Sequence, residues 1–146
     1  MECRIHKLVV DVALLAEGRV LLTRYRDVRR YDGQHGWFLP DDFLTHGEDP
    51  GEGARRVLRD QVGIEPPNVR LDHIESIADG AWHLIFHHVA ELPAVMEAAL
   101  GDNVEAATWF PLEGLPPGSD LAHGGWAADV LDRILATRSA ANSAPA

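Results

Sequence analysis

One segment in the middle of the chain restricts the fold more than any other, because it carries both end signals and the core-facing stripe of a helix. Asp49 is a good N-cap residue and Pro50 suits the first helical position. Gly63 follows where such a helix ends. Apolar residues recur between these ends at intervals of four, namely Ala54, Leu58 and Val62. The pattern predicts a helix over residues 50–62 that packs one face against a core.

Apolar runs that alternate with turns predict strands on both sides of this helix. Glu17-Gly18 and Asp79-Gly80 are the turn signals between neighbouring strands. The expected strands are residues 5–15, 19–25, 37–39, 69–78, 81–91 and 104–110. Two further helices are expected, a short one over residues 93–100 and a terminal one over residues 119–137. The sum is an α+β fold with a mixed sheet between two principal helices.

Length and composition limit the class of protein. The 146 residues suit one domain, which we place at residues 1–137, followed by a disordered tail at residues 138–146. The formal net charge of −10 argues against nucleic acid and anionic membranes as partners. Cys3 is the single cysteine, so an intramolecular disulfide is impossible, and a cytoplasmic location is natural. Self-association into a homodimer stays open.

The loop and the helix together carry a spaced set of residues: Glu48, Arg56, Leu58, Gly63 and Ile64. This set resembles the Nudix motif, which reads G, five residues, E, seven residues, R-E-U, one residue, E-E, one residue, G-U, where U is bulky and apolar. The flanking sequences are also similar, with Trp37 before the motif and Trp109 after it. The resemblance covers residues 5 to 137 and implies a Nudix-like α/β/α sandwich.

The departures from this motif lie at its chemical positions. Asp42 stands at the first glycine, with Asp41 before it, and the motif glutamates are replaced by Val57, Asp60 and Gln61. The family hydrolyses nucleoside diphosphates linked to another moiety, with Mg²⁺ or Mn²⁺ held mainly by those glutamates. The resemblance therefore implies a phosphohydrolase with a weakened metal site.

The remaining metal ligands are few. Mg²⁺ prefers near-octahedral oxygen ligation. Val57 offers no ligand atom, Gln61 offers a neutral carbonyl and Asp60 a shorter carboxylate. We expect Mg²⁺ or Mn²⁺ to bind weakly through Glu48, Asp60 and Gln61, with Glu48 and Asp60 as the catalytic residues. Asp41 and Asp42 either relocate the metal or only tolerate the turn geometry that the glycines served.

Glu48 and Arg56 are expected to form a structural pair, because the family's arginine clamps the loop glutamate against the helix. A bidentate contact of this kind would fix the loop of residues 41–48 on the helix.

Basic residues gather just before the motif. The candidates for holding substrate phosphate are Arg24, Arg26, Arg29, Arg30 and His46. Arginine forks suit phosphate oxygens, although a solvated, salt-bridged loop explains the same arginines equally well. His46 is either a phosphate contact or a solvated loop residue. His83, His87 and His88 share one expected strand, where one of them lining a pocket competes with ordinary packing.

Two functions follow from these patterns. The first is a Nudix-type phosphohydrolase that cleaves a phosphoanhydride in a small nucleoside-diphosphate-linked substrate. The second is a catalytically inactive Nudix fold that binds a nucleotide or another phosphorylated ligand, or a protein. In the first, the partner is a small phosphorylated molecule and neither nucleic acid nor membrane.

Overall fold

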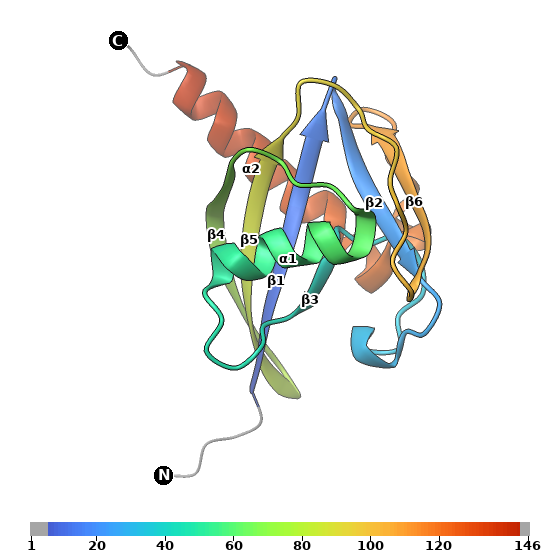
Figure 1. Cartoon of the computed structure of the whole chain (residues 1–146). Helices are drawn as coiled ribbons and strands as arrows, with labels where there is room; N and C mark the ends of the chain where they lie inside the picture. The colour runs from blue at the N-terminus through green and yellow to red at the C-terminus, as the bar shows by residue number, and fades with distance from the viewer. Residues whose placement is uncertain (1–5, 144–146) are drawn as a thin grey trace.

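The computed structural model describes residues 6–143 and contains a six-stranded mixed sheet with a helix on each face (Figure 1). The strands are β1 (His6–Ala16), β2 (Arg19–Tyr25), β3 (Asp41–Phe43), β4 (Val69–Asp79), β5 (Ala81–Glu91) and β6 (Val104–Pro111). Their order is β4-β5-β1-β2-β6, and the short β3 pairs with β1. β1 and β5 run parallel, and the other pairs are antiparallel.

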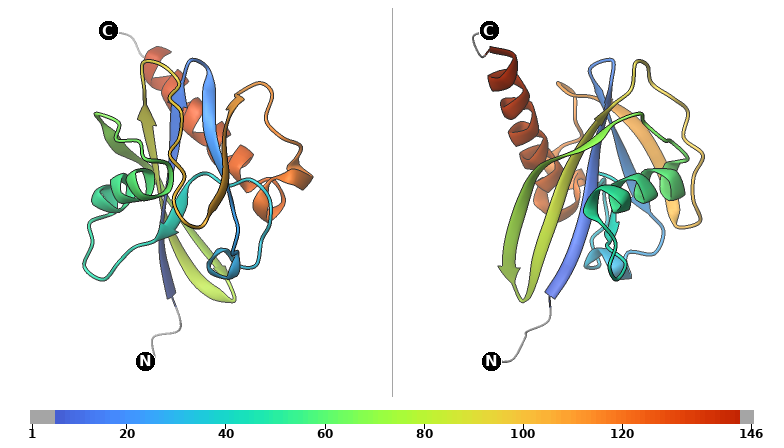
Figure 2. Two further views of the ribbon diagram at one scale, coloured as in Figure 1. Left: turned by 45° about the vertical axis from the view of Figure 1, so that its right-hand side comes forward. Right: turned by 60° about the vertical axis from the view of Figure 1, so that its left-hand side comes forward.

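The two long helices, α1 (Pro50–Val62) and α2 (Trp126–Ser143), cover opposite faces of the sheet, as the right-hand view of Figure 2 shows. Alternate residues of β1 point to opposite faces. Val10, Val12 and Leu14 join the core under α1. Ala13 and Leu15 join the core under α2. The expected α/β/α sandwich is confirmed.

The end signals of α1 act as predicted. The Asp49 carboxylate accepts hydrogen bonds from the backbone N–H groups of Gly51 and Glu52. Gly63 adopts the left-handed conformation, with a φ of 67°, and its N–H returns to the carbonyl of Arg59. Both ends of the helix are therefore fixed by local sequence.

Two expected elements are wrong. Residues 37–39 do not form a strand. Phe38 makes an isolated bridge with Thr23, and Trp37 makes one with Leu121. Residues 93–100 are not helical, because the N–H groups of this segment and its neighbour serve other elements. Ala99 donates to the carbonyl of Val62 at 2.9 Å, and Gly101 donates to that of Gln61 at 2.9 Å. These bonds satisfy the end of α1 instead of building a new helix.

The terminal helix is displaced from its expected bounds. Short 3-10 turns, η2 (Gly118–Asp120) and η3 (Ala122–Gly124), precede it. Gly125 has a φ of 100°, which interrupts the backbone, so that α2 begins only at Trp126. The helix then runs to Ser143, through six of the residues expected to be a disordered tail. Cys3 and residues 144–146 lie outside the described residues.

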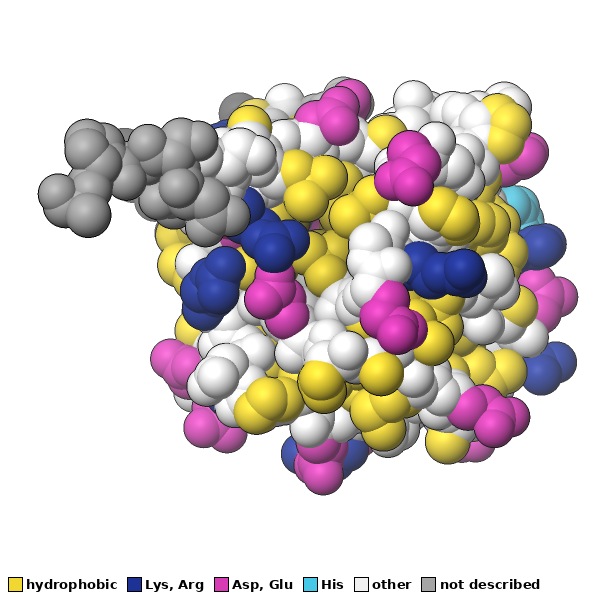
Figure 3. Space-filling view, turned by 90° about the horizontal axis from the view of Figure 1, so that it is seen from above, with side chains coloured by type: hydrophobic (Ala, Val, Ile, Leu, Met, Phe, Trp, Pro, Cys, Tyr) yellow, Lys and Arg dark blue, Asp and Glu magenta, His cyan; other side chains and the backbone are white. Residues whose placement is uncertain are grey.

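The surface seen in Figure 3 mixes both signs of charge. Acidic and basic side chains lie beside each other among apolar ones, and neither sign forms a broad field on this face. Within residues 6–143, no helix has the length and apolarity required to cross a bilayer.

Candidate functional site

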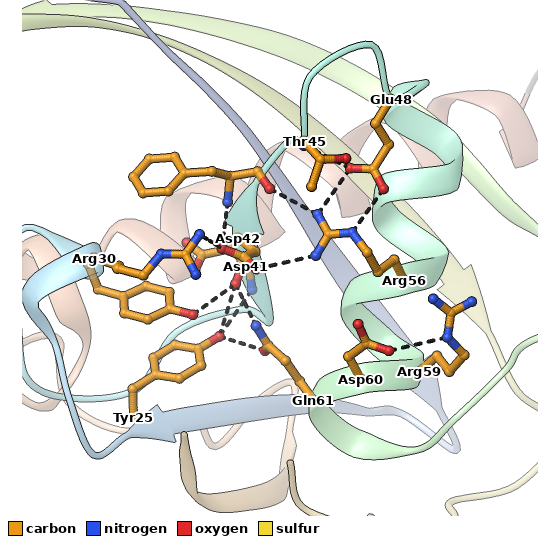
Figure 4. A network of polar contacts seen from close by, with 12 residues as sticks. Tyr25, Arg30, Asp41, Asp42, Thr45, Glu48, Arg56, Arg59, Asp60 and Gln61 are labelled. Atoms are coloured by element: carbon orange, nitrogen blue, oxygen red, sulfur yellow. Dashed lines mark hydrogen bonds and ion pairs between the residues drawn. The ribbon is translucent and has the colours of Figure 1, made fainter. Parts of the chain in front are cut away.

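The loop before α1 is fixed to the helix by an arginine clamp (Figure 4). Arg56 donates from Nε to Glu48 Oε2 at 2.8 Å and from a terminal nitrogen to Glu48 Oε1 at 3.0 Å. The same guanidinium contacts Asp42 Oδ2 at 3.3 Å and the carbonyl of Phe43 at 2.9 Å. The expected contact between Glu48 and Arg56 is confirmed, and Asp42 belongs to the same clamp.

Both oxygens of Glu48 are engaged by this clamp. The Thr45 backbone N–H also donates to Oε1, at 3.1 Å. The hydrogen bonds from Arg56 lower the pKa of the Glu48 carboxyl to about 2, against a smaller opposing effect of burial. Gly53 permits the close approach, because a Cβ there would lie 2.5 Å from Leu44 Cδ2 and 3.1 Å from Glu48 Oε1. Glu48 therefore acts structurally in this arrangement.

Gln61 faces β3 and closes a ring of hydrogen bonds with Tyr25 and Asp41 (Figure 4). Its Nε2 donates to the carbonyl of Asp41 at 2.7 Å, and its Oε1 accepts from the Tyr25 hydroxyl at 2.8 Å. The Asp41 N–H donates to the same hydroxyl at 3.1 Å. Tyr31 stacks on Tyr25, with ring centroids 3.8 Å apart. The side chain of Gln61 is thus committed to protein partners.

The other two altered motif positions lie apart from this ring. Val57 is 1% exposed and packs in the core beneath α1. Asp60 is 56% exposed and pairs with Arg59 at 3.2 Å, pointing away from Gln61 (Figure 4). Across the described part of the chain, no group of three His, Cys, Asp or Glu side chains is placed to hold a metal ion.

A cavity of about 530 Å³ lies on the α2 side of the sheet, within the range of small-molecule sites. Aromatic side chains supply much of its wall: Tyr31, Phe38, Phe43 and Trp126. Arg30, Asp32, Asp41, Asp42, His83 and His123 are its ionisable lining residues. The cavity therefore combines flat apolar surfaces with a few polar groups.

Asp41 occupies the buried part of this lining. Its side-chain Oδ1 has no hydrogen-bond partner among residues 6–143. Burial raises the pKa of the Asp41 carboxyl well above its usual range, and the nearby carboxylates of Asp11 and Asp42 raise it further. A neutral carboxyl is a poor ligand for Mg²⁺, and Asp42 already contacts both Arg30 and Arg56.

Only one of the four arginines reaches the cavity. Arg30 lines it and contacts Asp42 Oδ1 at 2.8 Å. Arg24 pairs with Glu105 at 3.6 Å, and Arg29 binds the carboxylate of Asp27. Arg26 is exposed and does not line the cavity.

His46 was a candidate for contacting substrate phosphate, but it does not line the cavity. His46 is exposed and lies outside the cavity lining. His83, by contrast, lines the cavity, which matches the alternative that one strand histidine faces a pocket.

A buried charged group lies on the α2 side of the sheet, and sequence reasoning missed it. His87 contacts Asp11 Oδ1 at 2.7 Å and Glu75 Oε1 at 2.8 Å, and Trp126 donates to the same Glu75 oxygen at 3.2 Å. Burial alone would lower the pKa of His87, but Asp11 and Glu75 outweigh it and the pKa is raised. The signal for Asp11 was its position as the single charge within the apolar run of residues 8–16.

Comparison with known proteins identifies the architecture. The family model of the NUDIX domain matches residues 5–133. The structure is similar to that of a MutT NUDIX hydrolase from Burkholderia pseudomallei, with 20% identity, a TM-score of 0.74, and coverage of 90% of this chain and 99% of that one.

Two ligand-bound structures are also similar. The NUDIX domain of NrtR from Shewanella oneidensis, complexed with ADP ribose, has 20% identity and a TM-score of 0.69, with 94% of this chain and 90% of that chain covered. A bifunctional NMN adenylyltransferase/ADP ribose pyrophosphatase from Francisella tularensis, complexed with AMP and a Mn ion, has 15% identity and a TM-score of 0.74. The match covers 94% of this chain and 43% of that one. At these identities the likeness concerns the fold.

Proposed function

Since the chain belongs to the Nudix family, we propose that it binds a small phosphorylated, nucleotide-derived molecule in the cavity on the α2 side of the sheet, without efficient phosphoanhydride hydrolysis. The observation that carries this proposal is the commitment of Gln61. At a position where the family motif has a glutamate, a neutral amide is held between the Tyr25 hydroxyl and the Asp41 carbonyl.

Nudix hydrolases generally use divalent metals such as Mg²⁺ or Mn²⁺, and the side chains available in this chain fit such an ion poorly. The Glu48 carboxylate is neutralised by Arg56, and Asp60 faces solvent beside Arg59. Val57 is apolar and buried. A hard cation would lack the several anionic oxygens that a catalytic Mg²⁺ site requires. No hydrolytic step is therefore derived through a metal.

The ligand class follows from the cavity and from the ligands of relatives. Aromatic walls suit a flat ring, and Arg30 suits an anionic group. ADP ribose, the ligand of the similar NrtR domain, carries both kinds of group and is the first molecule to test. A cytoplasmic location and the absence of nucleic-acid or membrane partners are part of the proposal, because the net charge is −10. A homodimer stays an expectation.

A phosphohydrolase with a weakened metal site is the second candidate. The observation in its favour is Asp41, a cavity-lining carboxyl whose Oδ1 has no partner within the described residues. An ion bound there would need an ionised Asp41, against the raised pKa of that carboxyl.

Calorimetry and turnover measured on the same preparation separate the two candidates. ADP ribose is titrated into the protein with and without Mg²⁺, and release of AMP is followed in parallel. We expect saturable binding that needs no metal, together with little AMP. Efficient Mg²⁺-dependent AMP release would establish the hydrolase instead, and no binding of ADP ribose or of other nucleoside diphosphate derivatives would refute the proposal.

A matched pair of variants locates the ligand. Arg30→Gln removes a charge from the cavity wall, whereas Arg26→Gln removes the same charge from an exposed position outside it. Losing one charged hydrogen bond to phosphate weakens binding by about 1.5–3 kcal/mol. We expect this loss for Arg30→Gln alone. Equal effects of the two substitutions would show that only net charge matters.

A further inference from the structure

Three basic side chains from distant parts of the chain converge on Asp32 at the cavity. Lys7 Nζ lies 3.5 Å from its carboxylate, His123 Nε2 3.5 Å and His83 Nε2 4.0 Å. Lys7 comes from β1, His83 from β5 and His123 from η3, while Asp32 directly follows η1 (Arg29–Tyr31). Asp32, His83 and His123 all line the cavity.

The two histidines are held differently. The Nδ1 atom of His83 lies 3.1 Å from the carbonyl of Ala81, which directs Nε2 toward Asp32. That Nε2 is buried and has no hydrogen-bond partner within residues 6–143. The His123 ring packs edge-on against Phe38 and Trp126, each with a centroid separation of 6.0 Å. Because Nδ1 of His83 donates to a carbonyl, its Nε2 can donate to an incoming anion in the imidazolium form of the ring, in which both nitrogens carry hydrogen.

The backbone on both sides of this cluster is unusual. Asp32 has a φ of 56° and His123 a φ of 54°, and Glu17 is the other non-glycine residue with positive φ in the described part of the chain. This conformation costs free energy for residues with a side chain and occurs preferentially at binding sites. It is used here at two cavity-lining residues whose side chains lie 3.5 Å apart.

We propose that Lys7, His83 and His123 form an anion subsite. In the free protein the Asp32 carboxylate occupies this subsite, and an anionic group of the ligand displaces it on binding. This inference rests on the proposed function, which it deepens by placing a phosphate of the ligand at the Asp32 end of the cavity. The sequence pointed to the arginines for this task, whereas the structure brings together a lysine and two histidines.

The electrostatic balance permits displacement of Asp32. The side chains of the cluster are 18% to 40% exposed, and ion pairs at such partly solvated positions are weak. The diphosphate of a ligand such as ADP ribose carries two negative charges at neutral pH and several acceptor oxygens, against one charge on Asp32. Phosphate therefore gains more from the same three basic groups than the internal carboxylate does.

Protonation of the His123 imidazole strengthens this site as the pH falls. Burial lowers the pKa of His123, Asp32 partly offsets this effect, and His83 adds to the lowering. The other charged groups at the cavity are Arg30 from η1 and the two carboxyls of β3, Asp41 and Asp42, with Arg30 and Asp42 already paired to each other. Tighter anion binding at pH 6 than at pH 8 is expected because protonation of the His123 imidazole adds a positive charge beside the anion.

The test uses pyrophosphate and the unmodified full chain, with the imidazole signals of His83 and His123 followed by NMR. Both signals should shift and saturate. Sulfate, whose charge is constant over this pH range, should bind more tightly at pH 6 than at pH 8. Unshifted imidazole signals, or sulfate affinity that does not increase toward pH 6, would overturn the subsite.

Variants at Asp32 test the displacement. Asp32→Asn removes the competing charge and keeps a residue that tolerates positive φ. Removing one like charge at about 4 Å in water corresponds to about a fivefold gain in pyrophosphate affinity. Asp102→Asn, an exposed position outside the cavity, makes the same change in net charge and should alter affinity less than twofold. Equal effects of the two substitutions would overturn the displacement.

Lys7→Gln supplies a second, independent variant and should weaken pyrophosphate binding. Unchanged affinity would remove Lys7 from the site. The outcomes also separate this inference from the proposed function. Binding of ADP ribose without any response of His83, His123 or the Asp32 variant would leave the function and refute the subsite. Pyrophosphate binding at the histidines without binding of any nucleoside diphosphate derivative would do the reverse.

Discussion

Breaking the contact between Arg56 and Glu48 should cost stability in a way that depends on pH. Arg56→Ala removes two hydrogen bonds to Glu48, one to Asp42 and one to the carbonyl of Phe43. The side chains of the pair are 19% and 13% exposed, so solvent screens this contact less than an open surface pair. Loss of a charged hydrogen bond lowers the free energy of unfolding by about 1–3 kcal/mol.

The pKa of Glu48 gives a second route to this magnitude. A folded pKa of about 2 and an unfolded pKa of about 4.3 correspond to a stabilisation of about 3 kcal/mol at pH 7. Because the folded pKa is lowered, this contribution is present above the unfolded pKa and is lost as the pH falls toward 2. Its value at pH 3 should be about half of that at pH 7.

Urea unfolding at pH 7 and pH 3 measures both effects. Arg56→Ala should move the midpoint at pH 7 downward by about 1 M, for a typical urea dependence. Glu48→Gln should destabilise at pH 7 and distinctly less at pH 3. Glu52→Gln, an exposed carboxyl in the first turn of the same helix, serves as the control and should stay within about 0.5 kcal/mol. An unchanged midpoint for Arg56→Ala, or a Glu48→Gln loss that does not shrink at low pH, would refute the reasoning.

Four further results are expected. Calorimetry should find Mg²⁺ binding in the millimolar range or undetectable; tight binding to the unmodified chain would contradict this. Val57→Glu should lower the free energy of unfolding by at least about 3 kcal/mol, because it buries an unpaired charge in the core under α1. Arg30→Ala should weaken ADP ribose binding in a titration while Arg24→Ala leaves it unchanged, since only Arg30 lines the cavity. His87→Gln should destabilise more at pH 6 than at pH 9 in urea unfolding, because a raised histidine pKa gives stability that is lost as the pH rises through it.

The elements predicted well were those whose signals are local. The N-cap and the terminal glycine of α1 lie within the segment that they bound, so the sequence alone places that helix. The helix expected over residues 93–100 is absent because the N–H of Ala99 binds the carbonyl of Val62 in α1 and the N–H of Val95 binds the Glu17 carboxylate, distant partners that no local pattern reveals. The start of α2 shows the same limit: the helix was expected from residue 119, but the left-handed backbone at Gly125 interrupts it, and α2 begins at Trp126.

The structural pair of Glu48 and Arg56 was predicted from the sequence, whereas the cavity and most of its lining residues were not. Glu48 and Arg56 could be paired from motif spacing, since seven residues lie between them, as in the motif. The four arginines were expected to hold phosphate, but a cluster of charge along the sequence does not show which acidic side chains lie near each arginine in space. Arg24 forms an ion pair with Glu105, and Arg29 forms one with Asp27. Lys7, His83 and His123 are far apart in the sequence and meet only through the sheet, so their grouping could not be read from spacing.

The two altered positions on the sheet side of α1 are linked to their surroundings, which explains why the motif glutamates cannot simply be restored. Val57 fills core volume, so a carboxylate there would be buried without a partner. Gln61 donates to the Asp41 carbonyl, and a glutamate at the same place would set a negative charge against that oxygen. Tyr25 and the backbone of Asp41 complete the same hydrogen-bond ring, so the ring depends on the Gln61 amide and not on the Asp41 side chain. At this position α1 therefore makes a neutral, hydrogen-bonded contact with β3 and offers no anionic metal ligand. The polar groups that can contact a bound small molecule lie in the cavity instead.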